Sequence, residues 1–252
     1  METPEQTKAV EPVRAGALAR PAFMAPGENL GKEAIDKSDL KMPRLTLAQG
    51  LSPQLQPTEP QFIEGLAFGD AFNSLTGRIY GKKPLRVVVV RAEKARYIEF
   101  IPKQLGGGIK DFNVPANDPR AQFFTDKDGV RQKPLATKFL EFIALLLGED
   151  GPEPIALSFK STGLDTAKTL NTLMTMATNE NTFDRVYELI PTQTKNNLGT
   201  WAIFGVRLVG MLEDEATYRM AQQLYASVKD RELAPDETVI TPDTDEREDV
   251  PF

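Results

Sequence analysis

Residues 137–147, TKFLEFIALLL, form the most apolar stretch of the chain, and Gly148 and Asp150-Gly151-Pro152 end it. So continuous an apolar run does not by itself distinguish a strand from a helix. Residues 155–160, IALSFK, alternate between apolar and polar side chains, as a half-buried strand does. The glycines and prolines between the two runs therefore predict a hairpin turn, and both flanking runs are predicted strands.

The rest of the chain adds short apolar runs separated by turn residues. The β-branched run 84–91 and the alternating run 96–101 form the clearest predicted strand pair. Further strands are predicted at 45–47, from 62, at 78–81, at 121–125 before a turn at Asp128-Gly129, at 183–191 and at 198–211. Helical spacing predicts helices over 163–177, capped by Ser161 or Thr162, and over 214–230. The sequence predicts a mainly β protein with two helices, and specifically an OB-like β-barrel.

Both ends of the chain are predicted to lie outside this barrel. Residues 1–40 contain four prolines and no sustained periodicity, which predicts a flexible N-terminal arm. Residues 232–252 carry eight acidic side chains against Arg247 and include three prolines, which predicts a disordered acidic tail. The expected core is 41–231.

The tail dominates the charge balance. The whole chain has 30 Lys and Arg against 36 Asp and Glu, a net charge of −6. Without residues 232–252 the balance is 29 against 28, a net charge of +1. An acidic chain normally argues against binding of nucleic acid, but here much of the negative charge lies in one detachable segment.

Composition also limits the chemistry. The chain has neither Cys nor His, which excludes thiol nucleophiles, thiolate metal sites and His-dependent catalysis. No acidic triad has a recognisable spacing, so we expect no enzymatic activity, no metal and no cofactor. The sequence shows no signal peptide and no membrane span, which predicts a soluble cytoplasmic protein without a membrane partner.

Four segments resemble phage-encoded single-stranded-DNA-binding proteins that have an OB core. The resemblance covers about residues 41–212 and the C-terminus, and it lies in the segments PRLTLAQ (43–49), GDAFNSLTG (69–77), SFKSTGL (158–164) and DVPF (249–252). It implies an OB fold, binding of single strands without sequence preference, and recruitment of replication, recombination or repair enzymes through the tail. It also implies location in the host cytoplasm.

A site of this kind needs aromatic rings that stack on bases and cations that follow the phosphates. Residues 78–103 meet this need best, since eight Lys and Arg and three aromatic residues lie among only two acids. The candidate nucleic-acid-binding residues are Arg78, Tyr80, Lys82, Lys83, Arg86, Arg91, Lys94, Arg96, Tyr97, Phe100, Lys103, Lys160 and Trp201. Phe100 and Trp201 have apolar neighbours, so they are also core candidates.

The tail has two predicted roles. Its acids are expected to occupy the basic groove when DNA is absent, and its aromatic terminus is expected to bind partner enzymes. The candidate partner-binding residues are Asp245, Glu246, Glu248, Asp249, Val250, Pro251 and Phe252.

Three other functions remain open at the level of sequence. A virion or scaffold protein would explain both flexible ends but not the aromatic terminus. A single-strand annealing protein would use the same DNA site and form rings, and we note that a homo-oligomer is compatible with either DNA-binding function. A carboxylate-dependent nuclease is the weakest candidate.

Overall fold

The computed structural model describes residues 41–102, 105–176, 178–196 and 199–230. The predicted arm, the acidic tail with its partner-binding residues, and Lys103 all lie outside the described residues. Within them, neither helix has the length and apolar composition needed to span a bilayer.

The predicted hairpin is the centre of the molecule. Strand β9 (Ala136–Gly148) pairs along its length with β10 (Gly151–Lys160), so both strand predictions are confirmed. With 13 residues, β9 extends roughly 44 Å. On its other side it pairs first with β5 (Arg96–Phe100) and then with β4 (Leu85–Ala92). The apolar run is continuous because β9 is buried on both faces, which explains why its pattern shows no single period.

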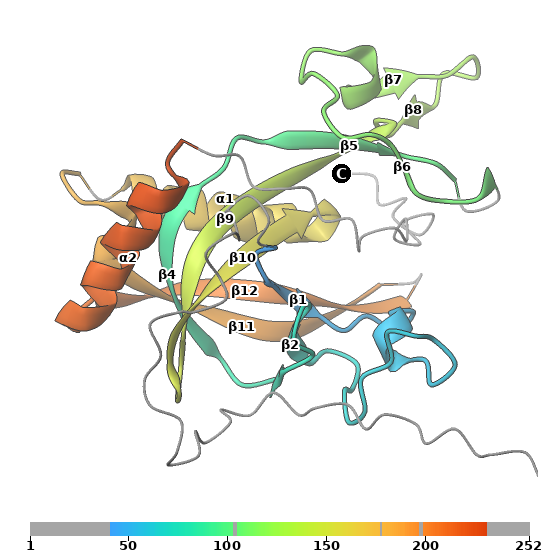
Figure 1. Ribbon diagram of the computed structural model, residues 1–252. Coiled ribbons are helices and arrows are strands. Elements are labelled where there is room, and N and C mark those ends of the chain that lie inside the picture. The colour runs from blue at the N-terminus through green and yellow to red at the C-terminus, as the bar shows by residue number, and fades with distance from the viewer. Residues whose placement is uncertain (1–40, 103–104, 177, 197–198, 231–252) are drawn as a thin grey trace, which may run out of the picture.

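The sheet is a strongly curled, open half-barrel (Figure 1). Its strands follow the order β12-β11-β4-β9-β10-β1-β2-β3, and all pairs are antiparallel except β1 with β10. The remaining bounds are β1 (Arg44–Leu47), β2 (Ala71–Asn73), β3 (Ile79–Gly81), β6 (Ile109–Asp111), β11 (Arg185–Asn196) and β12 (Gly199–Met211). A separate two-stranded sheet contains β7 (Phe124–Thr125) and β8 (Arg131–Gln132).

This topology corrects the predicted OB barrel. An OB fold is a five-stranded Greek-key barrel, whereas this sheet runs through eight strands in one open path. Strand β9 is long enough to pair with two successive strands, so β4 and β5 pair with it rather than with each other as predicted. The broader prediction, mainly β with two helices, is confirmed.

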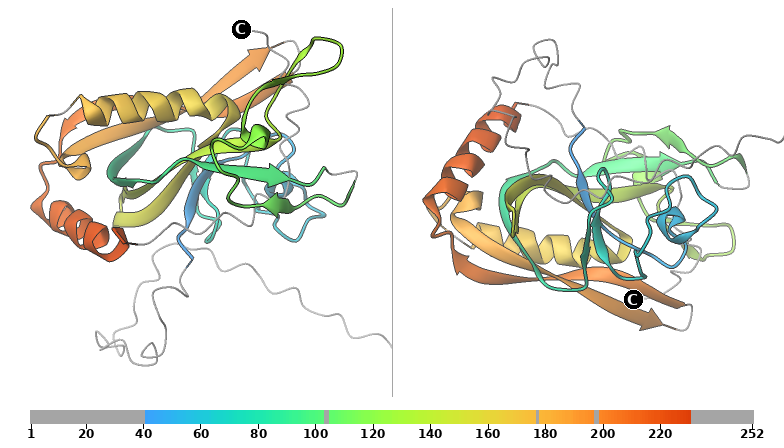
Figure 2. Two further views of the ribbon diagram at one scale, coloured as in Figure 1. Left: turned by 90° about the horizontal axis from the view of Figure 1, so that it is seen from above. Right: turned by 60° about the horizontal axis from the view of Figure 1, so that its bottom comes forward.

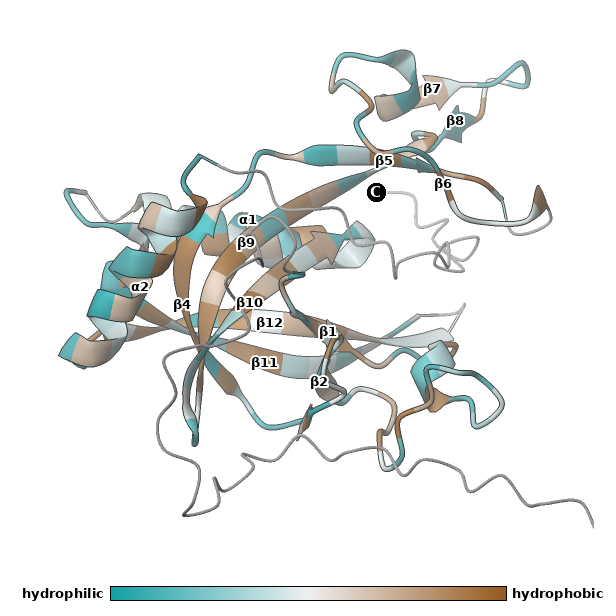
Figure 3. Ribbon diagram, in the orientation of Figure 1, coloured by the Kyte–Doolittle hydropathy of each residue, from teal (hydrophilic) through white to brown (hydrophobic). Residues whose placement is uncertain are grey.

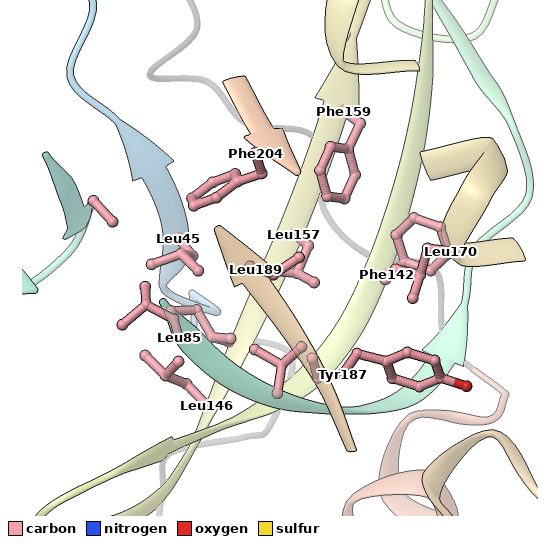
Figure 4. Packing of buried hydrophobic residues seen from close by; sticks show 14 of the residues in the cluster. Leu45, Leu85, Phe142, Leu146, Leu157, Phe159, Leu170, Tyr187, Leu189 and Phe204 are labelled. Carbon is pink, nitrogen blue, oxygen red and sulfur yellow. The ribbon is translucent and has the colours of Figure 1, made fainter. Parts of the chain in front are cut away.

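The inner face of the curled sheet holds the largest hydrophobic cluster (Figure 4). Phe142, Leu157 and Leu189 come from three different strands and meet there. Helix α1 (Leu164–Thr175) covers this face and inserts Leu170 into the cluster. Figure 2 shows α1 lying along the strands of the sheet. These contacts explain the periodic apolar stripe that predicted the helix.

The outer face is covered in part by helix α2 (Glu215–Val228), which packs Ala221 against Val88 and Val90 of β4. Asp214 caps this helix, since its side chain accepts a hydrogen bond from the Thr217 amide at 2.8 Å. Figure 3 shows the apolar residues concentrated on the central strands and polar residues on the exposed side of α2.

Two local predictions are wrong. The segment that begins at Phe62 contains turns and no strand. The predicted cap of α1 is also absent, because Ser161 and Thr162 belong to a short 3-10 helix and Gly163 occupies the N-cap position without a side-chain bond. The predicted turn at Asp128-Gly129 is confirmed, as it joins β7 to β8.

Candidate nucleic-acid interface

A β-bulge near the end of β4 turns one basic side chain to the outer face. Val87 and Val89 point to the inner cluster, and strict alternation would send Arg91 the same way. The register instead shifts between Val89 and Arg91, so Arg91 faces Ile143 of the outer cluster. Its guanidinium lies 3.1 Å from the Glu93 carboxylate and donates to the Val228 carbonyl at the end of α2.

Arg91 lines a hollow of about 410 Å³ between the end of β4, the start of β5 and the end of α2. Four cations and two acids line it, together with an alanine and an amide side chain: Arg91, Lys94, Arg96, Lys229, Glu93, Asp230, Ala95 and Asn113. The bond from Arg91 to Val228 connects β4 to the end of α2, where the next residue, Lys229, lines the hollow. Cations at a helix C-terminus are also favoured by the helix dipole. The hollow can therefore receive an anionic group.

A row of side chains crosses three strands beside this hollow. Arg96 of β5 lies opposite Phe139 of β9, and Phe139 lies opposite Lys160 of β10, so all three share the outer face. The Lys160 ammonium is 6.0 Å from the centre of the Phe139 ring, and the Phe100 ring is 6.3 Å from it. Phe139 is buried, whereas Phe100 is half-buried. Arg96 and Lys160 thus lie on either side of the buried Phe139, and the half-buried Phe100 lies next to its ring.

A buried ion pair lies beside this row on the same face. The Arg44 guanidinium donates to Glu141 Oε1 at 2.7 Å, and both side chains are less than a tenth exposed. Arg96 Nε lies 3.7 Å from the second oxygen of the same carboxylate. Glu141 thus joins β1, β9 and β5 and fixes the position of Arg96.

The first half of the predicted basic stretch lies elsewhere. Strand β4 separates Arg78, Tyr80, Lys82 and Lys83, which precede it, from Arg91, Lys94 and Arg96 at its other end. Three of the first group contact acids near the β9–β10 turn. Arg78 pairs with Asp150 at 2.8 Å and Lys83 with Glu149 at 3.5 Å, and the Tyr80 hydroxyl donates to Glu153. Burial, and then this bond, raise the pKa of Tyr80 well above its ordinary value.

The other predicted residues are dispersed. Arg86 is exposed on β4 opposite Glu188 of β11. Tyr97 points away from Arg96 and packs against a small cluster formed by Val114, Ala121 and Ala136. Trp201 lies half-buried on β12, an edge strand that β11 and β4 separate from β9.

Sequence reasoning missed four residues that the fold brings to this region. Lys229 and Asn113 line the hollow, Phe139 lies in the row, and Arg44 supports it. The prediction of Phe139 as a core residue is confirmed, since it is buried. No local pattern connects Lys229 at the end of α2 with the start of β5. Among the described residues, no group of three or more acidic side chains could hold a metal ion.

Comparison with known protein families gives one match. The family model described as Pam3 phage gp34-like protein matches residues 13–234. The chain therefore belongs to the Pam3 phage gp34-like protein family. No curated protein and no solved structure matches the chain.

Proposed function

We propose that this member of the Pam3 phage gp34-like family is a non-catalytic protein that binds single-stranded DNA without sequence preference. The observation that carries the proposal is the juxtaposition, on one face, of the cation-lined hollow with Arg96, Lys160 and the half-buried ring of Phe100, which lies beside the buried Phe139. Binding of this kind needs cations for phosphates and aromatic surface for bases, with no requirement for base-edge readout.

The spacing of the cations favours binding of a DNA strand over binding of a single small anion. Lys94 and Lys229 line the hollow, while Lys160 lies beyond Phe139 on β10, two strands away from β5. Neighbouring strands are about 4.8 Å apart, so Lys160 lies roughly 10 Å from β5 across the sheet. A chain of phosphates can contact both groups at once.

The sequence of the acidic tail, residues 232–252, suggests two further roles in this proposed function. Its eight acids would compete with phosphates for the basic face when DNA is absent, and Phe252 with its terminal carboxylate would bind replication or recombination enzymes. In this scheme DNA displaces the tail and makes it accessible to partners.

A titration with fluorescent oligo-dT at several salt concentrations, beside a duplex of mixed sequence, tests the proposal. We expect tight binding of the single strand that weakens steeply with salt, because binding releases condensed cations from the phosphates and this release is less favourable at high salt. Absence of binding at low salt, with the full chain and with a chain lacking residues 232–252, would contradict the proposal and favour an assembly protein.

A further inference from the structure

An exposed aromatic hairpin projects from the molecule close to the proposed DNA site. Residues 122–135, which we call the phenylalanine hairpin, contain β7 and β8 and lie beyond β5 and β6 in Figure 1. Phe123 is 57% exposed and Phe124 44% exposed. Large exposed apolar groups that gather on one projection indicate a binding surface rather than a core.

The base of the hairpin is fixed to the sheet. Val114 and Ala121 are buried with Ala136 of β9, and Tyr97 packs against them. The Arg120 guanidinium pairs with three carboxylates. It lies 2.8 Å from Glu99, 3.1 Å from Asp111 and 2.9 Å from Asp118. The hairpin therefore begins from a rigid support.

The tip is organised by one carboxylate. Asp126 accepts hydrogen bonds from the amides of Asp128 and Val130 at 2.9 and 2.8 Å, and from the Gln132 side chain at 2.6 Å. Gly129 has a φ of 78°, a backbone conformation that is unfavourable for residues with a side chain. A two-stranded hairpin alone is marginally stable in water, so these bonds help to hold β7 and β8 together.

The charge around the rings suits nucleic acid. Arg131 lies 4.4 Å from the centre of the Phe123 ring, and Lys127 and Lys133 are exposed on the same hairpin. Against Asp126 and Asp128, these three cations leave the hairpin a net charge of +1. An aromatic ring accompanied by an arginine is the arrangement that stacks on bases while it attracts phosphates.

The hairpin is also connected to the hollow. Asn113 lines the hollow, and the adjacent Phe112 is 40% exposed. The amide of Val114 then bonds to the Tyr97 carbonyl at 3.0 Å, which holds this segment beside β5. A single strand of DNA that leaves the hollow past Phe112 would reach the base of the phenylalanine hairpin.

We propose that the phenylalanine hairpin is a base-stacking extension of the DNA site, in which Phe123 and Phe124 stack on bases of a strand whose phosphates contact the hollow. This inference rests on the proposed function and deepens it. It implies a longer binding site than the hollow and the row provide.

The full-length variant F123A/F124A tests the inference by titration with long and short oligo-dT. We expect roughly a tenfold loss of affinity for the long oligonucleotide, little change for the short one, and an unchanged salt slope, because stacking releases no counterions. F123Y/F124Y keeps both rings and should retain the parent affinity.

V130A/L135A is the matched control, because Val130 and Leu135 are aliphatic side chains of the same hairpin and are similarly exposed. It should bind as the parent does. Parent affinity of F123A/F124A, or an equal loss in V130A/L135A, would overturn the inference. So would sedimentation that shows an oligomeric parent and a monomeric F123A/F124A variant. If the parent binds no oligo-dT, the proposed function itself fails.

Discussion

The side-chain amide of Gln49 forms two hydrogen bonds with the backbone of Ala202, which lies 153 positions later in the chain. Gln49 Nε2 donates to the Ala202 carbonyl at 2.8 Å, and the Ala202 amide donates to Gln49 Oε1 at 3.0 Å. Gln49 follows β1, while Ala202 lies in β12, the edge strand at which the sheet order begins. One side chain thus takes the place of a neighbouring strand and joins two distant parts of the half-barrel.

Gln49→Leu should lower the free energy of unfolding by about 1–3 kcal/mol, because it leaves two backbone groups of a buried residue without partners. Chemical denaturation followed by circular dichroism measures the change. Gln61→Leu is the control, since Gln61 is exposed and bonds only to Gln54 in the described structure. Equal stability of the two variants would contradict the closing role of Gln49.

Arg44→Met should destabilise the protein by about 3–5 kcal/mol, because it leaves the Glu141 carboxylate buried beside a single, more distant guanidinium. Arg219→Met provides the comparison, since Arg219 pairs with Glu215 on the exposed surface of α2 and should cost no more than about 0.5 kcal/mol. Denaturation midpoints of the two variants measure the difference. A loss below about 1 kcal/mol for Arg44→Met would show that the ion pair does not stabilise this face.

The strands could be predicted from sequence because their signals are local. The apolar run of β9, the turn after it and the alternation of β10 are all contiguous. The order of strands could not be predicted, because the pairing of β1 with β10 and the bond from Gln49 to Ala202 join distant segments. The prediction of an OB-like barrel was wrong because it assumed a different order of strands.

The candidate site was predicted in part for the same reason. Arg91, Lys94 and Arg96 are neighbours in sequence and line one hollow. The bulge that turns Arg91 outward has no sequence signature, and β4 carries Arg78 and Lys83 to its opposite end. Composition identified the basic stretch 78–103, but not that β4 separates its cations into two groups at opposite ends of the strand.

Because the two groups of cations lie apart, charge reversal in one group should affect DNA binding more than charge reversal in the other. K94E/K229E, which changes two cations of the hollow, should weaken binding of oligo-dT at least tenfold and reduce the salt slope by about 1 for each phosphate that the variant no longer neutralises. K82E/K83E changes two exposed lysines before β4 and should have a smaller effect. Titration at three salt concentrations measures both quantities. If both variants bind equally weakly, the hollow is not the main phosphate site.

The support of the phenylalanine hairpin should depend on pH. Hydrogen bonds from Lys110 and then Arg120 lower the pKa of Glu99, and the bond from Arg120 lowers the pKa of Asp118. Carboxyl groups with lowered pKa values stabilise the fold above their unfolded pKa, which is about 4, and lose that contribution as the pH falls through the folded value. Arg120→Ala should therefore destabilise the protein at pH 7 and much less at a pH well below 4. Urea denaturation at both pH values measures this, and an equal effect would contradict it.

Deletion of residues 232–252 should increase affinity for oligo-dT at low salt, because it removes eight acids that, in the proposed scheme, compete with phosphates, and it changes the net charge from −6 to +1. The difference from the full chain should shrink as salt rises, since exposed charges are screened. A chain in which only Phe252 is replaced by Ala separates the two roles of the tail. It keeps every acid and should bind DNA as the parent does, while it loses affinity for partner enzymes. Unchanged DNA affinity after the deletion at low salt would show that the tail does not compete with DNA.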